Sequence, residues 1–230
     1  MELEEKKVNS IKYWLYEELF GNWNKFEGLF VISLLLMQLF IYILNPDSGL
    51  GMLAGIFGVL CVTFVAKGKI SNYIFGFIQI GITIFLGLQA RLWGELLENS
   101  MYFIAQFVGW KNWEKNLKED THLVKTRKLD LAGWTISLGT VLLGSFILGS
   151  IFAFFNGSQP FADATTTVIA FVAQVLMIRR YREQWIFWFI LNLVSIYVWN
   201  IEGNISMVAM YIAFTLNNWY GYINWKKLQS

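Results

Sequence analysis

Eight apolar stretches, each long enough to cross a bilayer, constrain the fold of this chain more than any other feature. A membrane-spanning helix needs about 20 mostly apolar residues. The 230-residue chain is 56% hydrophobic but only 15% charged, against roughly 25% charged residues in a soluble domain. We therefore expect an all-α integral membrane protein with eight transmembrane helices, near residues 28–45, 49–66, 72–90, 93–112, 131–155, 162–178, 184–200 and 205–225.

The charges in the loops test this count independently, because cytoplasmic loops collect Lys and Arg. If the N-terminus lies inside, every Lys and Arg except Arg91 falls on the inner side, so both termini are expected in the cytoplasm. Residues 10–24 place Trp14, Leu15 and Leu19 at helical spacing, which predicts an amphipathic helix on the membrane surface. The charged run 111–128 is expected to be a solvated inside connector. We expect no cleaved signal peptide, because residues 1–10 lack a short apolar core followed by a small-residue cleavage site.

An internal repeat relates residues 51–113 to residues 163–225 without a gap, at a shift of 112. Each copy holds three spans and one span lies between them, so both copies enter the membrane in the same orientation, as in transporters with parallel repeats. We expect a 3+1+3 arrangement of two parallel three-helix bundles, with a substrate cavity between them and an additional peripheral helix. The predicted parts are the N-terminus 1–27, the peripheral helix 28–45, the first bundle 49–113, the inside loop and linker helix 114–160, the second bundle 161–225 and the tail 226–230.

Side-chain amides and aromatic rings recur on single faces of the predicted helices. An unpaired polar group costs most free energy at mid-membrane. We therefore expect the amides nearest mid-membrane to face the cavity. The predicted substrate-binding residues are the amides Gln106, Gln174, Asn192 and Asn218 and the rings Trp110, Trp188 and Tyr222. Two alternatives remain open: the amides also fit hydrogen bonds between helices, and the rings Trp110, Trp113, Tyr222 and Trp225 also fit an aromatic belt at the membrane interface.

No Asp, Glu, Lys, Arg or His occupies the centre of a predicted span. Carriers coupled to protons or ions usually need such a residue, so downhill transport is the simpler mechanism. The chain has one histidine, His122, in the charged inside loop and one cysteine, Cys61, in an apolar run. These residues cannot build a metal cluster or a histidine-based catalytic triad. We therefore expect no catalytic residues, no metal site and no cofactor.

Three motifs together resemble the PnuC transporters of bacteria. They are Gln106-x-x-Gly-Trp-x-x-Trp113, Trp185-x-x-Trp-x-x-x-Asn192 and Asn217-Asn-Trp-Tyr-Gly-Tyr-x-x-Trp225. The resemblance covers nearly the whole chain from Phe26 onward. It implies a SWEET-like fold in the bacterial inner membrane, surrounded by membrane lipid, and facilitated diffusion of nicotinamide riboside, a form of vitamin B3. It further implies trapping of the substrate by a cytoplasmic nicotinamide riboside kinase, and assembly as a homotrimer.

The substrate that the resemblance implies fits the chemistry of the predicted site. Trp110 and Trp188 can stack on the cationic pyridinium ring, a contact worth roughly 0.5–2 kcal/mol. Side-chain amides both donate and accept hydrogen bonds, as a carboxamide and ribose hydroxyls require. A phosphorylated substrate would need basic residues, which the span centres lack. Related vitamins such as thiamine or riboflavin, a nucleoside sensor that does not transport, and a membrane enzyme remain as alternatives, while nothing in the charge balance suggests nucleic acid as a partner.

Overall fold

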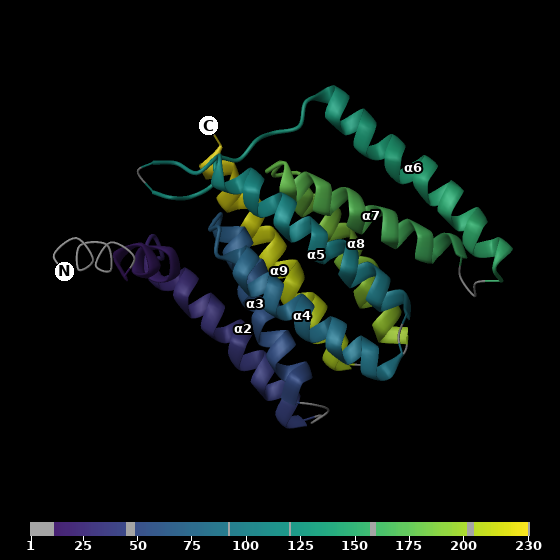
Figure 1. The fold of residues 1–230 in the computed structure, drawn as a ribbon, viewed down its shortest axis with the longest axis horizontal. Helices are drawn as coiled ribbons and strands as arrows, with labels where there is room; N and C mark the ends of the chain where they lie inside the picture. The colour runs from purple at the N-terminus through teal and green to yellow at the C-terminus, as the bar shows by residue number, and fades with distance from the viewer. Residues whose placement is uncertain are drawn as a thin grey trace. The chain divides into compact units, whose positions relative to one another are not determined.

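A computed structural model describes residues 12–44, 49–91, 93–119, 121–156, 160–201 and 205–229. Within these ranges long helices dominate the fold (Figure 1), and each coincides with a predicted stretch to within a few residues. The helices are α2 (Lys25–Leu44), α3 (Gly49–Lys67), α4 (Asn72–Ala90), α5 (Trp93–Glu114), α6 (Leu131–Phe154), α7 (Pro160–Ile178), α8 (Gln184–Ile201) and α9 (Ile205–Leu228).

The apolar character of these helices makes the chain a multi-pass membrane protein. Among the described residues, five helices are long and apolar enough to cross a bilayer, namely α2, α3, α4, α6 and α7. An apolar helical segment of α8, Gln184–Tyr197, is shorter than that. The sequences of α5 and α9 are more polar, because α5 contains Glu95 and Glu98 in its first two turns and α9 contains Lys226 and Lys227 in its last turn. Spanning by all eight helices therefore stays a prediction.

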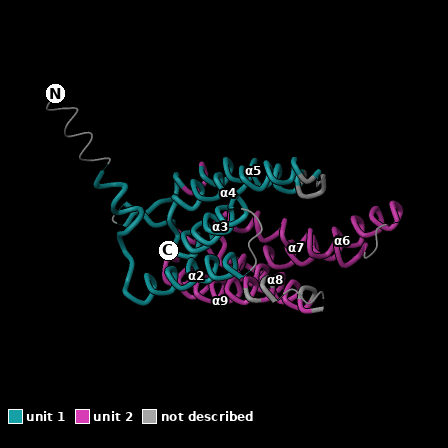
Figure 2. Tube along the Cα trace, turned by 90° about the horizontal axis from the view of Figure 1, so that it is seen from below, with its two compact units in different colours: residues 1–110, 114–124 teal, residues 111–113, 125–230 magenta. Residues whose placement is uncertain are grey.

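The chain divides into two compact units (Figure 2), one of residues 1–110 and 114–124 and the other of residues 111–113 and 125–230. In the first unit α3 packs against α2 and α4. In the second unit α7 packs against α6 and α8, and α8 also packs against α9. The predicted linker helix, α6, therefore belongs to the same compact unit as the second repeat.

The predicted repeat reappears as the same backbone motif at the ends of α3 and α7. After α3, Gly68 has a φ of 80° and the Lys69 N–H donates to the Phe64 carbonyl at 3.0 Å. After α7, Arg180 has a φ of 66° and the Tyr181 N–H donates to the Leu176 carbonyl at 2.9 Å. Both are helix ends closed by a left-handed residue, a position that favours glycine.

Arg180 adopts this conformation despite its side chain, and local contacts hold it there. Its Nε donates to Asn112 Oδ1 at 3.1 Å and its Nη1 donates to the Lys125 carbonyl at 2.8 Å. These two bonds offset part of the steric cost of a positive φ in a residue with a Cβ atom.

The connector between α5 and α6 differs from the expectation of a solvated loop. Val124 and Thr126 are 0% and 1% exposed. The Val124 N–H donates to the Gly68 carbonyl and the Arg127 N–H donates to the Arg180 carbonyl, each at 2.8 Å. Gly68 and Arg180 are equivalent residues of the repeat, so the connector makes the same backbone contact with the helix end of each unit. The charged residues of this run thus alternate with buried residues whose backbone is hydrogen-bonded to the helix ends.

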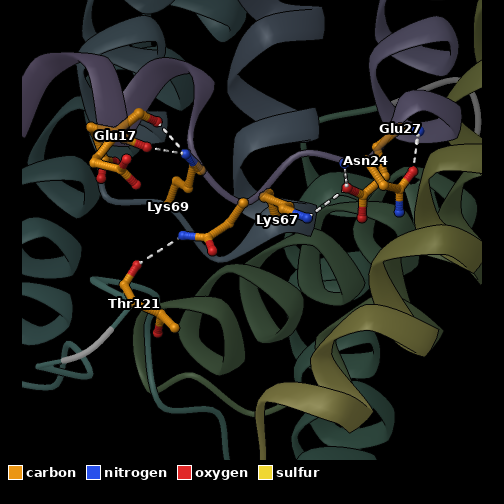
Figure 3. A network of polar contacts seen from close by, with 8 residues as sticks. Glu17, Asn24, Glu27, Lys67, Lys69 and Thr121 are labelled. Atoms are coloured by element: carbon orange, nitrogen blue, oxygen red, sulfur yellow. Dashed lines mark hydrogen bonds and ion pairs between the residues drawn. The ribbon is translucent and has the colours of Figure 1, made fainter.

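A polar network in the first unit ties its N-terminal helical stretch, residues 12–20, to the turn after α3 (Figure 3). Lys69 Nζ donates to the backbone carbonyls of Glu17 and Glu18 at 2.7 and 2.6 Å. The Ser71 N–H donates to the Glu18 carboxylate at 2.8 Å. The expected start of the amphipathic helix, residues 10–11, lies outside the described residues.

The same network contains a buried ion pair. Lys67 Nζ lies 2.6 Å from Glu27 Oε2, and both side chains are 7% exposed. Glu27 also forms a capping box with Asn24 at the start of α2: the Glu27 N–H donates to Asn24 Oδ1 at 2.9 Å and the Asn24 N–H donates to Glu27 Oε2 at 2.8 Å. Burial lowers the pKa of the neighbouring Lys69 to about 8, although the nearby Glu18 carboxylate opposes this shift.

Candidate substrate-binding site

In the first unit, the amide of Gln106 packs directly against the backbone of α4 at Gly76, which has no side chain. Gln106 comes from α5 and is 6% exposed. A Cβ atom added to Gly76 of α4 would overlap Gln106 Nε2 and lie 3.0 Å from its Cδ. Gln106 Oε1 is buried and has no hydrogen-bond partner among the described residues. Gly76 therefore makes room for an amide whose oxygen remains available to accept a hydrogen bond.

Aromatic rings line the same part of the first unit. Trp110 lies one turn after Gln106 on α5 and is half-buried. Its ring centroid is 6.3 Å from that of Tyr73 and 6.4 Å from that of Phe77, both on α4. The ring centroid of Phe77 in turn lies 4.6 Å from that of Phe107 on α5. The structure thus places the predicted ring Trp110 in an aromatic cluster beside the predicted amide.

In the second unit, the two predicted amides Asn192 and Asn218 are buried on adjoining helices. Asn192 of α8 is 5% exposed and Asn218 of α9 is 6% exposed. Asn218 Nδ2 is buried and lacks a hydrogen-bond partner within the described part of the chain. A buried amide without a partner costs free energy, so a ligand that accepts a hydrogen bond from it would recover that cost.

The remaining predicted residues of the second unit are half-buried. Trp188 packs against the apolar core formed by α7 and α8. Gln174 lies on α7 and Tyr222 on α9, both with intermediate exposure. The Arg182 guanidinium lies 5.7 Å from the centroid of the Tyr222 ring, so this ring already contacts a cation.

Two tryptophans of the alternative aromatic belt are fully buried instead. Trp113 and Trp225 are both 0% exposed, and their ring centroids lie 5.6 Å apart with an edge-to-face arrangement. The Trp113 indole N–H donates to the Met177 carbonyl at 3.1 Å. These two rings are therefore part of the interior of the second unit, which excludes an interfacial belt for them.

Sequence reasoning missed a pair of ring-on-glycine contacts that the repeat explains. A Cβ atom on Gly109 would lie 2.5 Å from Tyr73 Oη, and one on Gly221 would lie 2.5 Å from a carbon of the Trp185 ring. Gly109 and Gly221 are equivalent positions of the repeat, as are Tyr73 and Trp185. The repeat contained a signal for this packing, because an aromatic residue and a glycine occur at equivalent positions in both copies.

Gln184 is a second residue that the sequence analysis did not place in the site. It is the first residue of α8, is fully buried, and neither amide atom has a hydrogen-bond partner among the described residues. Its repeat equivalent Asn72 is also fully buried, at the start of α4, and Asn72 Nδ2 donates to the Lys69 carbonyl at 2.6 Å. The equivalent helices α4 and α8 thus both begin with a buried side-chain amide.

Buried charges lie away from the middle of the described helices, and the Arg182 guanidinium beside Tyr222 is one of them. Among the described residues, the buried charged side chains lie near helix ends or in the turns that join them, and they are Glu18, Glu27, Lys67, Lys69, Arg180, Arg182 and Glu183. The described part of the chain also holds no group of three or more His, Cys, Asp and Glu that could bind a metal ion. The arrangement offers hydrogen bonds and ring faces to a ligand, without a charged group at mid-helix.

Comparison with known proteins gives a consistent family. The family model described as "Nicotinamide mononucleotide transporter" matches residues 48–227. The "Nicotinamide riboside transporter PnuC" of Neisseria mucosa is 36% identical over 98% of this chain and 89% of its own length. The protein of the same name from Haemophilus influenzae is 36% identical over 93% of this chain and 95% of its own length. The corresponding Escherichia coli protein is 28% identical over 76% of this chain and 82% of its own length.

A solved structure agrees with these relatives. A crystal structure of the vitamin B3 transporter PnuC superposes with a TM-score of 0.80 at 36% sequence identity, covering 94% of this chain and 97% of the other. These relatives are transporters and not enzymes. From its sequence and from its fold, this chain belongs to the PnuC family of membrane transporters.

Proposed function

We propose that this protein carries nicotinamide riboside across the bacterial inner membrane by facilitated diffusion. The observation that carries the proposal is the similarity, over nearly the whole chain, to relatives named as nicotinamide riboside transporters. The substrate-binding residues in this proposal are the seven predicted ones, Gln106, Trp110, Gln174, Trp188, Asn192, Asn218 and Tyr222. Apart from the Arg182 guanidinium beside Tyr222, the local surroundings of these residues support an uncharged, partly aromatic site.

The two amides with unpaired atoms are complementary in their hydrogen bonding. Gln106 offers the acceptor Oε1 and Asn218 offers the donor Nδ2. The carboxamide of nicotinamide has both an N–H₂ donor and a carbonyl acceptor, and each ribose hydroxyl has both functions as well. A ligand group that donates to Gln106 Oε1, or one that accepts from Asn218 Nδ2, would pair a buried atom that has no partner among the described residues, and this pairing favours the bound state.

The two tryptophans supply the contact for the positively charged ring. Trp110 and Trp188 are half-buried, so each keeps part of its surface available. An indole face attracts a cation within about 6 Å of its centroid, by roughly 0.5–2 kcal/mol. Nicotinamide riboside carries its charge in a flat pyridinium ring, which suits stacking on such a face.

Nicotinamide mononucleotide is the second candidate substrate, because the family model is described by that name. The mononucleotide adds a phosphate with about −1.5 to −2 charges near neutral pH. The described mid-helix residues supply no Lys or Arg to compensate it, and burying an uncompensated charge costs several kcal/mol. We therefore favour the riboside as the transported form.

A neutral carrier of this kind works downhill. No Asp, Glu, Lys, Arg or His in the middle of a described helix is buried as a relay for coupled protons or ions. Retention of the substrate then requires a chemical step, and we assign it to a cytoplasmic nicotinamide riboside kinase, whose charged product no longer fits the site. Eight membrane spans, both termini in the cytoplasm and a homotrimer complete the proposal.

Uptake into protein-containing liposomes tests the proposed function. We expect labelled nicotinamide riboside to enter until its internal and external concentrations are equal, with no dependence on an imposed proton or sodium gradient. The same vesicles should not take up nicotinamide mononucleotide, thiamine or riboflavin at a comparable rate. Binding of riboside without uptake would indicate a sensor, and accumulation driven by a gradient would contradict facilitated diffusion.

The proposed residues have a matched control in these vesicles. Gln106→Ala and Asn218→Ala should reduce riboside uptake, because each removes an amide with an unpaired atom. Gln38→Ala makes the same chemical change on α2, where a buried amide nitrogen also lacks a partner among the described residues. Uptake should stay near the wild-type rate in Gln38→Ala. Equal loss in all three variants would mean that the effect comes from folding and not from substrate contacts.

A further inference from the structure

A groove with a cavity volume of about 360 Å³ lies in the second unit between α6 and α7. None of the seven proposed substrate-binding residues lines it. Its walls come from the first half of α6, the last half of α7 and the turn after α7, and they include Ile136, Ser137, Thr140, Phe171, Val175 and Arg179. The groove is thus apolar along most of its length, with two hydroxyl groups on the α6 side.

The mouth of the groove is basic. Arg179 lines it and is exposed. Tyr181 lines it too, and the Arg127 guanidinium stacks 4.7 Å from the centroid of the Tyr181 ring. Lys128 is exposed next to the lining residue Leu129.

Backbone pairing holds this cluster of cations in place. The Arg127 N–H donates to the Arg180 carbonyl at 2.8 Å, and the Arg182 N–H donates to the Arg127 carbonyl at 3.0 Å. One carboxylate, that of Asp130, also lines the mouth, but it accepts a hydrogen bond from the Gly133 N–H at 2.8 Å as the cap of α6. A second carboxylate, that of Glu183, accepts from the Leu129 N–H at 2.9 Å and is paired with Arg182 at 3.0 Å. The exposed Arg127, Lys128 and Arg179 therefore outnumber the one remaining carboxylate, Asp130, and leave this end of the groove positive.

The dimensions of the groove match one leaflet of a bilayer. Its lining runs along α6 from Asp130 to Thr140, which is about 15 Å at 1.5 Å per residue. That is half of the roughly 30 Å hydrocarbon thickness. Both α6 and α7 are long and apolar enough to span the membrane, and the basic mouth lies at the end of the helices that carries the Lys and Arg of the predicted cytoplasmic loops.

We propose that this groove binds one anionic phospholipid of the membrane leaflet on its basic side. The headgroup phosphate contacts Arg127, Lys128 and Arg179, and an acyl chain lies along Ile136, Thr140 and Phe171. Charge complementarity selects this occupant, because basic pockets between transmembrane helices bind anionic headgroups while the apolar walls fit a hydrocarbon chain. The site is separate from the substrate-binding residues and does not depend on which vitamin is carried.

Native mass spectrometry of the full chain released from lipid nanodiscs tests the proposal. In nanodiscs of mixed phosphatidylglycerol and phosphatidylcholine, we expect one tightly retained phosphatidylglycerol per chain. Arg179→Gln should lower its occupancy about fivefold, the effect of one basic side chain near an anionic lipid. Lys115→Gln removes another exposed cation outside the groove and should leave occupancy unchanged. Equal retention of phosphatidylcholine, or equal loss in both variants, would overturn the proposal.

A second pair of variants tests the acyl-chain path without touching charge. Thr140→Trp fills the groove from an exposed position of α6, whereas Leu143→Trp adds the same ring to the 67% exposed Leu143 outside it. Retained phosphatidylglycerol should fall in the first variant and persist in the second, with riboside binding intact in both. Cross-links between two copies of the chain through this groove, in place of a bound lipid, would show that a protein surface covers it and would refute the lipid site.

Discussion

Gly76→Ala is the most informative single change in the proposed site, because the added methyl group meets the amide of Gln106. The new Cβ atom would overlap Gln106 Nε2 and lie 3.0 and 3.2 Å from its Cδ and Oε1. These atoms are the far end of a flexible side chain, so the amide can turn away while the helices keep their packing. The variant therefore displaces a proposed ligand contact without deleting it.

The expected loss follows from the hydrogen bonds of one amide. A net intramolecular hydrogen bond is worth about 0.5–1.5 kcal/mol, so the loss of one or two contacts from Gln106 weakens binding by roughly 0.5–3 kcal/mol. This corresponds to an increase in Kd of about 2- to 150-fold. Folding should not suffer, because replacing a helical glycine by alanine favours the helix by about 0.5–1 kcal/mol.

Isothermal titration of purified protein with nicotinamide riboside measures the effect. Gly81→Ala is the matched control on the same helix, since an added Cβ there meets nothing within 4 Å. It should raise thermal stability as Gly76→Ala does and bind riboside normally. In a Gln106→Ala background, Gly76→Ala should cause little further loss. Wild-type affinity in Gly76→Ala, or full additivity of the two changes, would refute the role given to Gln106.

Three further predictions concern stability. Glu27→Ala leaves Lys67 buried without its partner and should lower the free energy of unfolding by about 3–5 kcal/mol, measurable by thermal unfolding in detergent; no loss would mean that the pair is not formed. Gly221→Ala forces the rigid Trp185 ring to move, because the nearest ring carbon would lie 2.5 Å away, and should cost about 1–3 kcal/mol, seen as a lower Tm. Burial lowers the pKa of Lys69 to about 8 from 10.5. The unfolded chain thus binds more protons between these pH values, and stability should rise with pH across that window; Lys69→Met should abolish the rise, and an unchanged pH profile would contradict the shift.

The sequence was sufficient to predict the helices because long apolar stretches have few alternatives in a bilayer. The repeat was predictable too, because it aligns without a gap at a shift of 112. The turns at Gly68 and Arg180, which are 112 residues apart, both have a positive φ. The buried connector was not predictable in this way. Its many charges indicate a solvated loop, while the pairing of Val124 with Gly68 depends on residues far apart in the chain, for which a single sequence gives no periodic signal.

The candidate site was predictable in part. Helical periodicity singled out Gln106, Asn192 and Asn218, and the structure buries all three. Periodicity identifies the face of a helix but not the neighbour that it meets. The fit of Gln106 against Gly76, and the contact of Tyr222 with Arg182, both required the packing of elements that only the structure provides.

The central claim is that a neutral site of amides and rings recognises the riboside and not its phosphate. A titration of the purified protein with nicotinamide riboside and with nicotinamide mononucleotide tests it most directly. We predict saturable binding of the riboside and at least about 100-fold weaker binding of the mononucleotide, because its buried phosphate would lack a cationic partner. Equal affinity for the two ligands, or tighter binding of the mononucleotide, would contradict this account of the site.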